Sequence, residues 1–116
     1  MANPNLFTAS SIYGNTGVLI ANSTPANVIS NVANSSSIVK VNTVTLANYS
    51  TATISANVEI FRGGVSYYIA GNLAVPNNAS IMVSAKDSAF YLVEGDGLRI
   101  TSSANLAITA AYEVIS

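Results

Sequence analysis

Apolar and polar side chains alternate along much of the chain, which is typical of β-strands with one buried face. In TISANVEIF, residues 53–61, every second side chain from Ile54 to Ile60 is apolar. The same period recurs in NLAITAAYEV, residues 105–114, from Leu106 to Val114. No stretch of a dozen residues repeats apolar positions at helical spacing above a polar opposite face. The pattern therefore predicts an all-β protein.

Short turn segments separate these alternating runs. RGG at 62–64 indicates a hairpin into VSYYIAGNLAV, and Pro76 ends that strand before SIMVSA. EGDG at 94–97 joins FYLV to LRITSS, where Asp-Gly between apolar runs is a hairpin signal, and SSAN leads into the last strand. About seven strands are expected from Ser37 onward, at the short spacing of a sandwich or small barrel. We expect a single antiparallel β-sandwich, immunoglobulin-like or jelly-roll-like, with about seven to nine short strands.

The N-terminal part differs from the rest because the first 39 residues carry no charged side chain. It holds two short β-prone stretches, TGVLIAN and NVISNV, which either add edge strands or form an arm laid on a neighbouring subunit. An uncharged free edge favours pairing with another chain. We therefore expect one domain, with residues 1–36 as an interface region and residues 37–116 as the sandwich core.

Charged side chains are scarce and several reactive residue types are missing. Charged residues make up 8% of the chain, against about a quarter in an ordinary soluble domain. Asn, Ser and Thr fill the gap, which predicts a surface that is neutral and polar or covered by other subunits. The chain has no His and no Cys, which removes most zinc sites and every His-assisted nucleophile. We expect neither an enzyme nor a bound cofactor or metal.

The same composition bounds the partners. With four Lys and Arg residues and a net charge of −1, the chain has no positively charged surface to bind a phosphate backbone, so nucleic acid is not expected as a partner. The longest aliphatic run, VLIA at 18–21, is far shorter than the ~20 residues of a membrane helix. The first residues lack the basic and apolar regions of a secretory signal, so we expect synthesis and assembly in a cytoplasm.

The acidic segment EGDG, residues Glu94, Gly95, Asp96 and Gly97, is the main candidate site. Two carboxylates two positions apart on a turn do not ensure the facing geometry of a glycoside hydrolase, and they lack the loop spacing of a calcium cage. We interpret the segment as a turn that also contributes to an interface, with metal binding as the weaker alternative. Lys40, which interrupts SIVKVNTVTL, suits either an edge strand or an interface.

A second candidate surface is aromatic. Tyr68 and Tyr91, with the loop residues Asn77 and Asn78, are the positions that would contact a carbohydrate or a receptor. Tyr67 and Tyr68 are adjacent on one predicted strand and point to opposite faces, so at least one of them is expected in the core.

The ordered segments KVNTVTLAN, ATISANVEIFRGGVSYYIA, LAVPNNAS, YLVEGDGLRITSS and LAITAAYEVIS resemble small β-sandwich virion proteins of tailed bacteriophages. The shared features are a strand ending in Asn, a YYIA-like strand, a VP-x-x-(A/S)-S turn, an acidic Gly-Asp turn and a terminal YE-x-I strand. The resemblance covers residues 37–116, and its motifs are structural turns. EGDG departs slightly from the commoner forms of the acidic turn, and the N-terminal part is the least similar.

The resemblance implies a structural role on a phage particle. The expected function is a capsid decoration, or cement, protein that binds the major capsid protein on the outer surface of the head as a homo-oligomer. Such a protein would stabilise contacts between capsomers. The alternatives are a tail or neck accessory protein, or a tip protein that binds carbohydrate or a receptor.

Overall fold

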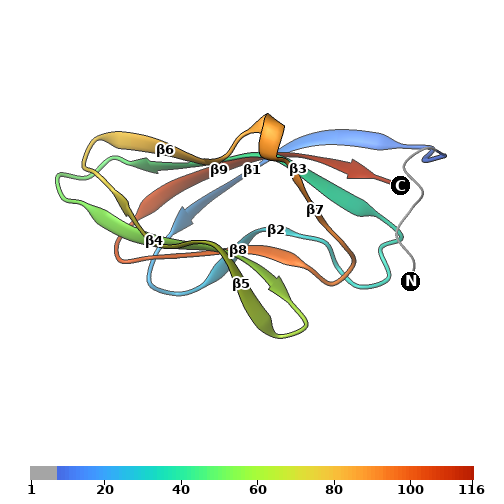
Figure 1. The fold of residues 1–116 in the computed structure, drawn as a ribbon, viewed down its shortest axis with the longest axis horizontal. Helices are drawn as coiled ribbons and strands as arrows, with labels where there is room; N and C mark the ends of the chain where they lie inside the picture. Colours follow the sequence, from blue (N-terminus) through green and yellow to red (C-terminus); the bar gives the residue numbers. More distant parts are fainter. Residues whose placement is uncertain (1–7) are drawn as a thin grey trace.

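The computed structural model describes residues 8–116, which form two packed antiparallel sheets (Figure 1). Sheet A has the strand order β1-β9-β3-β6, with β7 also pairing with β3, and sheet B has the order β2-β8-β4-β5. The strands are β1 (Ile12–Ala21), β2 (Ala26–Ser30), β3 (Ile38–Asn48), β4 (Ile54–Arg62), β5 (Val65–Val75), β6 (Ala79–Ser84), β7 (Phe90–Leu92), β8 (Gly97–Ser102) and β9 (Leu106–Ile115). The predicted β-sandwich is therefore confirmed, and seven of these strands follow Ser37.

The connections give this sandwich a jelly-roll topology. The chain passes between the sheets after β1, β2, β3, β5, β7 and β8, so most consecutive strands lie in opposite layers. Only β4 and β5 form a hairpin among the described strands, closed by Gly63 and Gly64 with φ of 60° and 77°. Both glycines adopt the left-handed conformation that a tight two-residue turn requires.

The EGDG hairpin expected between residues 90 and 102 is wrong. β7 pairs with β3 in sheet A, whereas β8 pairs with β2 and β4 in sheet B, so the segment crosses between layers. Gly95 has a φ of 88°, and the Asp96 amide donates to the Val93 carbonyl at 3.0 Å. These features describe a type II turn, which does not need the two strands to pair with each other.

The core lies between the sheets and follows the period-two pattern of the sequence. Ile54, Ala56 and Val58 from β4 are buried as predicted, and so are Leu106, Ile108 and Ala110 from β9. The most buried large side chains come from both layers: Leu46, Ile54, Leu92, Leu98, Ile100, Leu106 and Ile108, with Val41, Val44, Val58 and Val75. Removing so much apolar surface from water is the main driving force for this fold.

The first 36 residues supply two edge strands, β1 in sheet A and β2 in sheet B. Residues 1–7, the beginning of the expected interface region, lie outside the described residues. No helix in the described part of the chain is long and apolar enough to span a membrane. The helical content between residues 8 and 116 is a single 3-10 turn at Lys86–Ser88.

Candidate functional site

The acidic turn has a structural role, because the Asp96 carboxylate links two parts of the chain. Asp96 is 3% exposed, and its two carboxylate oxygens accept hydrogen bonds from Arg62 Nε at 2.8 Å and Nη2 at 2.6 Å. The Val93 amide donates to the same carboxylate at 2.9 Å. Hydrogen bonding to Asp96 raises the pKa of the Arg62 guanidinium above its ordinary value. The carboxylate therefore ties the turn before β8 to the end of β4.

Glu94 belongs to the same turn but faces a different partner. Its Oε2 accepts the Ser36 amide at 2.6 Å, which connects the turn to the loop between β2 and β3. Asn31 joins the same two segments from a buried position, because its Nδ2 donates to the Leu92 and Ser37 carbonyls, both at 3.0 Å. Glu94 and Asp96 are thus engaged in separate structural contacts. The EGDG segment forms a turn in the structure, whereas its expected contribution to an interface stays a prediction.

A second ion pair lies on the outer face of sheet B. Arg99 Nε donates to Glu59 Oε1 at 2.6 Å, and Glu59 is only 4% exposed. Ser66 Oγ donates to the same Glu59 oxygen at 3.0 Å, and the Arg99 guanidinium carbon lies 3.7 Å from the centroid of the Phe61 ring. Alternation in β4 placed Glu59 on the solvent side, and sequence reasoning missed its burial. The cause is its cross-strand neighbour Arg99, which covers the carboxylate.

Lys40 does not lie on an edge strand. It is in β3, an interior strand, opposite Glu113 of β9 on one side and Tyr91 of β7 on the other. Between residues 8 and 116, no group of three or more acidic side chains gathers in a way that could hold a metal ion.

The residues proposed to contact carbohydrate are spread over the molecule. Tyr68 lies on β5 and Tyr91 on β7, in different sheets, while Asn77 and Asn78 lie in the turn after β5. About nine strand positions at ~3.3 Å each separate Tyr68 from this turn, so it is roughly 25–30 Å away. The structure therefore does not bring Tyr68 together with the two asparagines.

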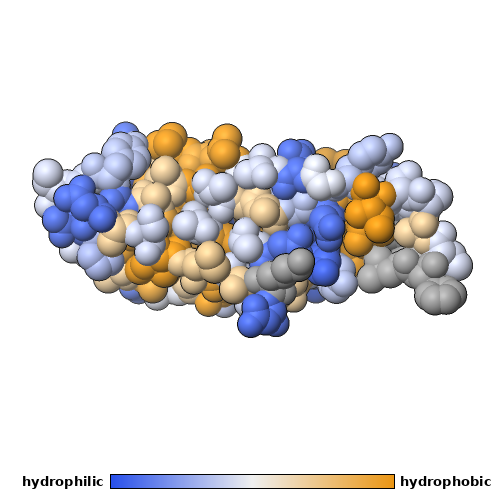
Figure 2. Space-filling model, turned by 90° about the horizontal axis from the view of Figure 1, so that it is seen from above, coloured by the Kyte–Doolittle hydropathy of each residue, from blue (hydrophilic) through white to orange (hydrophobic). Residues whose placement is uncertain are grey.

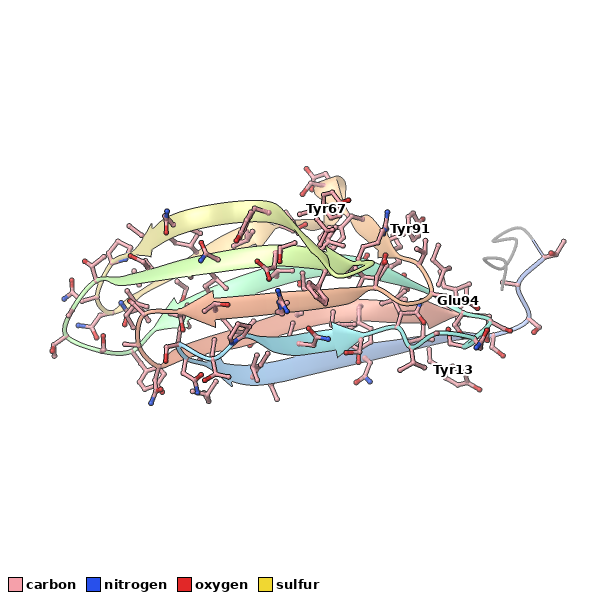
Figure 3. The ribbon with its side chains drawn as sticks, turned by 90° about the horizontal axis from the view of Figure 1, so that it is seen from below. Tyr13, Tyr67, Tyr91 and Glu94 are labelled. Carbon is pink, nitrogen blue, oxygen red and sulfur yellow. The ribbon has the colours of Figure 1, made fainter. Side chains whose placement is uncertain are left out.

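Tyr67 and Tyr68 are 56% and 62% exposed, so the expectation that one of them is in the core is wrong. The end of the β4–β5 hairpin extends away from sheet A, as Figure 1 shows, and the side chains of Tyr67 and Tyr68 are exposed there. Figure 3 places Tyr67 and Tyr91 along one long side of the sandwich and Tyr13 along the opposite side.

The outer face of sheet A is an extended neutral surface. Strand register places its side chains in rows across the sheet: Val18–Thr109–Thr45–Met82, Ile20–Ala107–Ala47–Ser80, Thr16–Ala111–Thr43 and Gly14–Glu113–Lys40–Tyr91. These positions face outward because their neighbours in sequence, such as Ile108 and Leu46, are buried. Glu113 and Lys40 are its charged residues, and they have opposite signs. Figure 2 shows blue side chains only in separate groups among pale and orange ones.

Large apolar side chains are exposed on this face and elsewhere on the described chain. Val18 is 74% exposed and Ile20 52%, and both line a shallow apolar depression of about 380 Å³ between β1 and β9. The other exposed large apolar residues are Ile12, Tyr13, Val32, Tyr49, Val65, Tyr67, Tyr68, Ile69, Met82 and Tyr91. A contiguous exposed apolar patch, such as that of Val18 and Ile20, is typical of surfaces that other molecules cover.

Comparisons with known proteins bear on the fold. A scan against models of protein families found no match, and neither did a search of curated proteins. Among solved structures, the chain is similar to one described as "Bacillus endospore appendages form a novel family of disulfide-linked pili". The two are 14% identical over 99% of this chain and 95% of that one, with a TM-score of 0.52.

A second similar structure is the nucleoplasmin-like N-terminal domain of Drosophila FKBP39. The two chains are 7% identical, and their alignment covers 93% of this chain and 90% of the FKBP39 domain, with a TM-score of 0.47. At these identities the likeness to the first structure supports the β-sandwich fold alone. Neither description names a phage protein, so the likeness to phage virion proteins rests on the sequence motifs.

Proposed function

We propose that this chain is a non-enzymatic structural subunit that attaches in many copies to a large assembly. Its most specific form is a decoration protein on the outer surface of a tailed-phage head, where it contacts the major capsid protein and bridges capsomers. The observation that carries this proposal is the neutral outer face of sheet A, with Val18, Ile20 and Met82 exposed among threonine and alanine side chains.

The use of charge supports the same proposal. Of the nine charged side chains in the sequence, four are committed to the pairs Arg62–Asp96 and Arg99–Glu59. Glu94 accepts a backbone amide across the end of the sandwich. Charges that hold the fold together contribute little to the attraction of a distant partner, so contact must come from apolar and neutral polar groups. A sheet face of threonine, alanine and exposed apolar side chains suits close approach to another neutral surface.

Attachment of this kind is passive. A rigid sandwich fills a site between neighbouring subunits of a shell and resists their separation without any chemical step. Each contact can be modest, because an oligomer that engages several shell subunits gains from a high effective concentration.

A second candidate is a subunit of a protein filament, and the similarity to the Bacillus endospore appendage structure favours it. That structure is described as belonging to disulfide-linked pili, whereas this chain contains no cysteine. A filament of this chain would therefore be held by non-covalent contacts between sheets or strands.

The proposal is tested by locating and counting the protein. Antibodies against the recombinant chain are applied to phage particles purified from a culture that carries the gene, and its copy number per particle is measured by quantitative mass spectrometry. Hundreds of copies on intact heads, retained in high salt, are expected because a neutral contact is not weakened by screening. About a dozen copies would indicate a tail or neck position, and absence from particles combined with labelled fibres would indicate the filament.

A further inference from the structure

The free edge of β1 differs from the other free edges of the sandwich. All ten residues of β1 pair with β9 without a register shift, and the strand has neither charge nor proline. The register of β2 shifts between Asn27 and Ile29, that of β6 shifts opposite Val44 and Thr45, and that of β5 shifts twice. Bulges twist an edge away from incoming strands, and very short strands offer little to pair with. Among the described strands, β1 alone has a long and regular free edge.

Hydrogen bonding at the start of β1 shows which groups this edge presents. Ser11 and Ser116 exchange both backbone hydrogen bonds, each at 2.9 Å. In an antiparallel pair such residues alternate with ones whose amide and carbonyl point away. The residues that present both groups to the free edge are Ile12, Gly14, Thr16, Val18 and Ile20.

The Thr16 amide agrees with this alternation. This amide donates to Oδ1 of the neighbouring Asn15 at 2.8 Å and not to a carbonyl of β9. No strand from residues 8–116 pairs with this edge. The Asn15 contact is local and exposed, so an incoming carbonyl can replace it.

We infer that β1 pairs with β1 of a second copy of this chain, antiparallel and about a two-fold axis, so that sheet A continues from one subunit into the other. The inference rests on the proposed function in so far as it names how copies associate. A regular edge needs a regular partner of similar length, and β1 itself is the one such partner that the described chain offers. Both edges are uncharged, so no like charges oppose each other when they meet.

The outward-facing groups also predict the register. A two-fold axis at Thr16 pairs Thr16 with its own copy, Gly14 with the partner's Val18, and Ile12 with the partner's Ile20. This register uses the whole strand, because every outward amide and carbonyl from Ile12 to Ile20 finds a partner. The side chains also fit, since the exposed Val18 lies opposite a glycine and the two isoleucines pack together.

Two-fold pairing is closed, because each copy uses its single regular edge once. It therefore predicts a dimer as the end product and not a growing fibre. If β1 of one copy paired instead with the β6 edge of the next, each copy would keep a free edge. The assembly would then be open and would grow into a fibre. The two arrangements place the partner on opposite edges, so single substitutions distinguish them.

The test compares three lysine variants of the full chain. Val18→Lys places a charge at the proposed contact, Val32→Lys places the same charge at a loop valine of similar exposure (74% and 67%), and Met82→Lys places it on β6. Self-association is measured by sedimentation equilibrium from about 1 to 100 μM, the range in which a modest interface is detected. We expect the dimer dissociation constant to rise by at least about tenfold for Val18→Lys alone.

Hydrogen exchange provides a second readout that does not depend on a variant. The amides of Gly14, Val18 and Ile20 are expected to exchange more slowly as the protein concentration rises. Those of Tyr13, Gly17 and Leu19, which bond to β9, should be protected at every concentration. Thr16→Cys should also form a disulfide-linked dimer on oxidation, because a hydrogen-bonded pair has Cα atoms about 5.5 Å apart.

A wild-type chain that stays monomeric over this range overturns the inference. So does rapid exchange of the Gly14, Val18 and Ile20 amides at concentrations where the protein is dimeric. Fibres that Met82→Lys abolishes would show β1–β6 pairing in place of the two-fold dimer. The proposed function fails separately from this inference. A dimer that is absent from phage particles would rule out decoration and leave β1 pairing intact. A monomer found on phage heads would rule out β1 pairing and support decoration.

Discussion

Replacing Asp96 by alanine removes the carboxylate that holds the crossing between the two sheets. The variant loses two hydrogen bonds to Arg62, at 2.8 and 2.6 Å, and one from the Val93 amide at 2.9 Å. The Arg62 side chain is 50% exposed and regains water, so its lost pair contributes no more than about 1 kcal/mol. The Val93 amide is half-buried and is left without its acceptor, which costs about 1–2 kcal/mol.

The sum is about 1–3 kcal/mol of unfolding free energy, or a fall in Tm of roughly 5–15 °C for a chain of this size. Urea unfolding followed by circular dichroism measures it, with Asp87→Ala as the control because Asp87 is exposed in the 3-10 turn. Asp96→Asn keeps an acceptor for the Val93 amide and loses only the ionic attraction to Arg62. We therefore expect its unfolding free energy to fall by about 1 kcal/mol. If Asp96→Ala were no more destabilising than Asp87→Ala, the stabilising role assigned to the Asp96 carboxylate would be wrong.

Four further substitutions, of which Gly14→Ala is a control, test other parts of the fold by the same unfolding measurement. Asn48→Ala removes a buried amide that donates at 2.8 and 2.9 Å to two carbonyls, and we expect a loss of about 2 kcal/mol, whereas no loss would mean that water replaces it. Gly17→Ala places a methyl group 2.9 Å from the Val28 carbonyl and should destabilise by about 1–3 kcal/mol. Gly14→Ala in the same strand meets open space and should not destabilise, so equal effects would contradict this packing. Leu98 is 0% exposed, and Leu98→Ala should lower the unfolding free energy by about 2–5 kcal/mol because it leaves a cavity in the core. A loss below about 1 kcal/mol would show that the surrounding core closes around the smaller side chain.

Local sequence patterns were sufficient for most of the strands. The alternation in residues 53–61 and 105–114 corresponds to β4 and β9, and the two glycines at 63 and 64 close the predicted hairpin. These features depend on neighbours in the chain, because side-chain direction alternates along a strand and glycine tolerates positive φ. Burial of Glu59 broke the pattern, since the residue that covers it, Arg99, is forty positions away.

The candidate site was predicted less well for the same reason. EGDG was identified as a turn, but the sequence does not reveal that Arg62 binds Asp96 or that Ser36 binds Glu94. The buried asparagines Asn31 and Asn48 carried only a weak signal. Asn48 is the last residue of β3 and matches the strand-ending Asn of the phage-like motif. Nothing in the sequence distinguishes Asn31 from the other residues of its Asn-rich segment.

The sequence by itself determined that this chain forms short strands with one apolar face, that its turns fall at glycine, proline and asparagine, and that it carries few charges. These properties follow from residue type and spacing alone. Only the tertiary structure decided which strands share a sheet, that the acidic turn crosses between layers, and that β1 retains a regular free edge. Strand pairing joins residues far apart in the chain, and no local preference specifies which partner a strand receives.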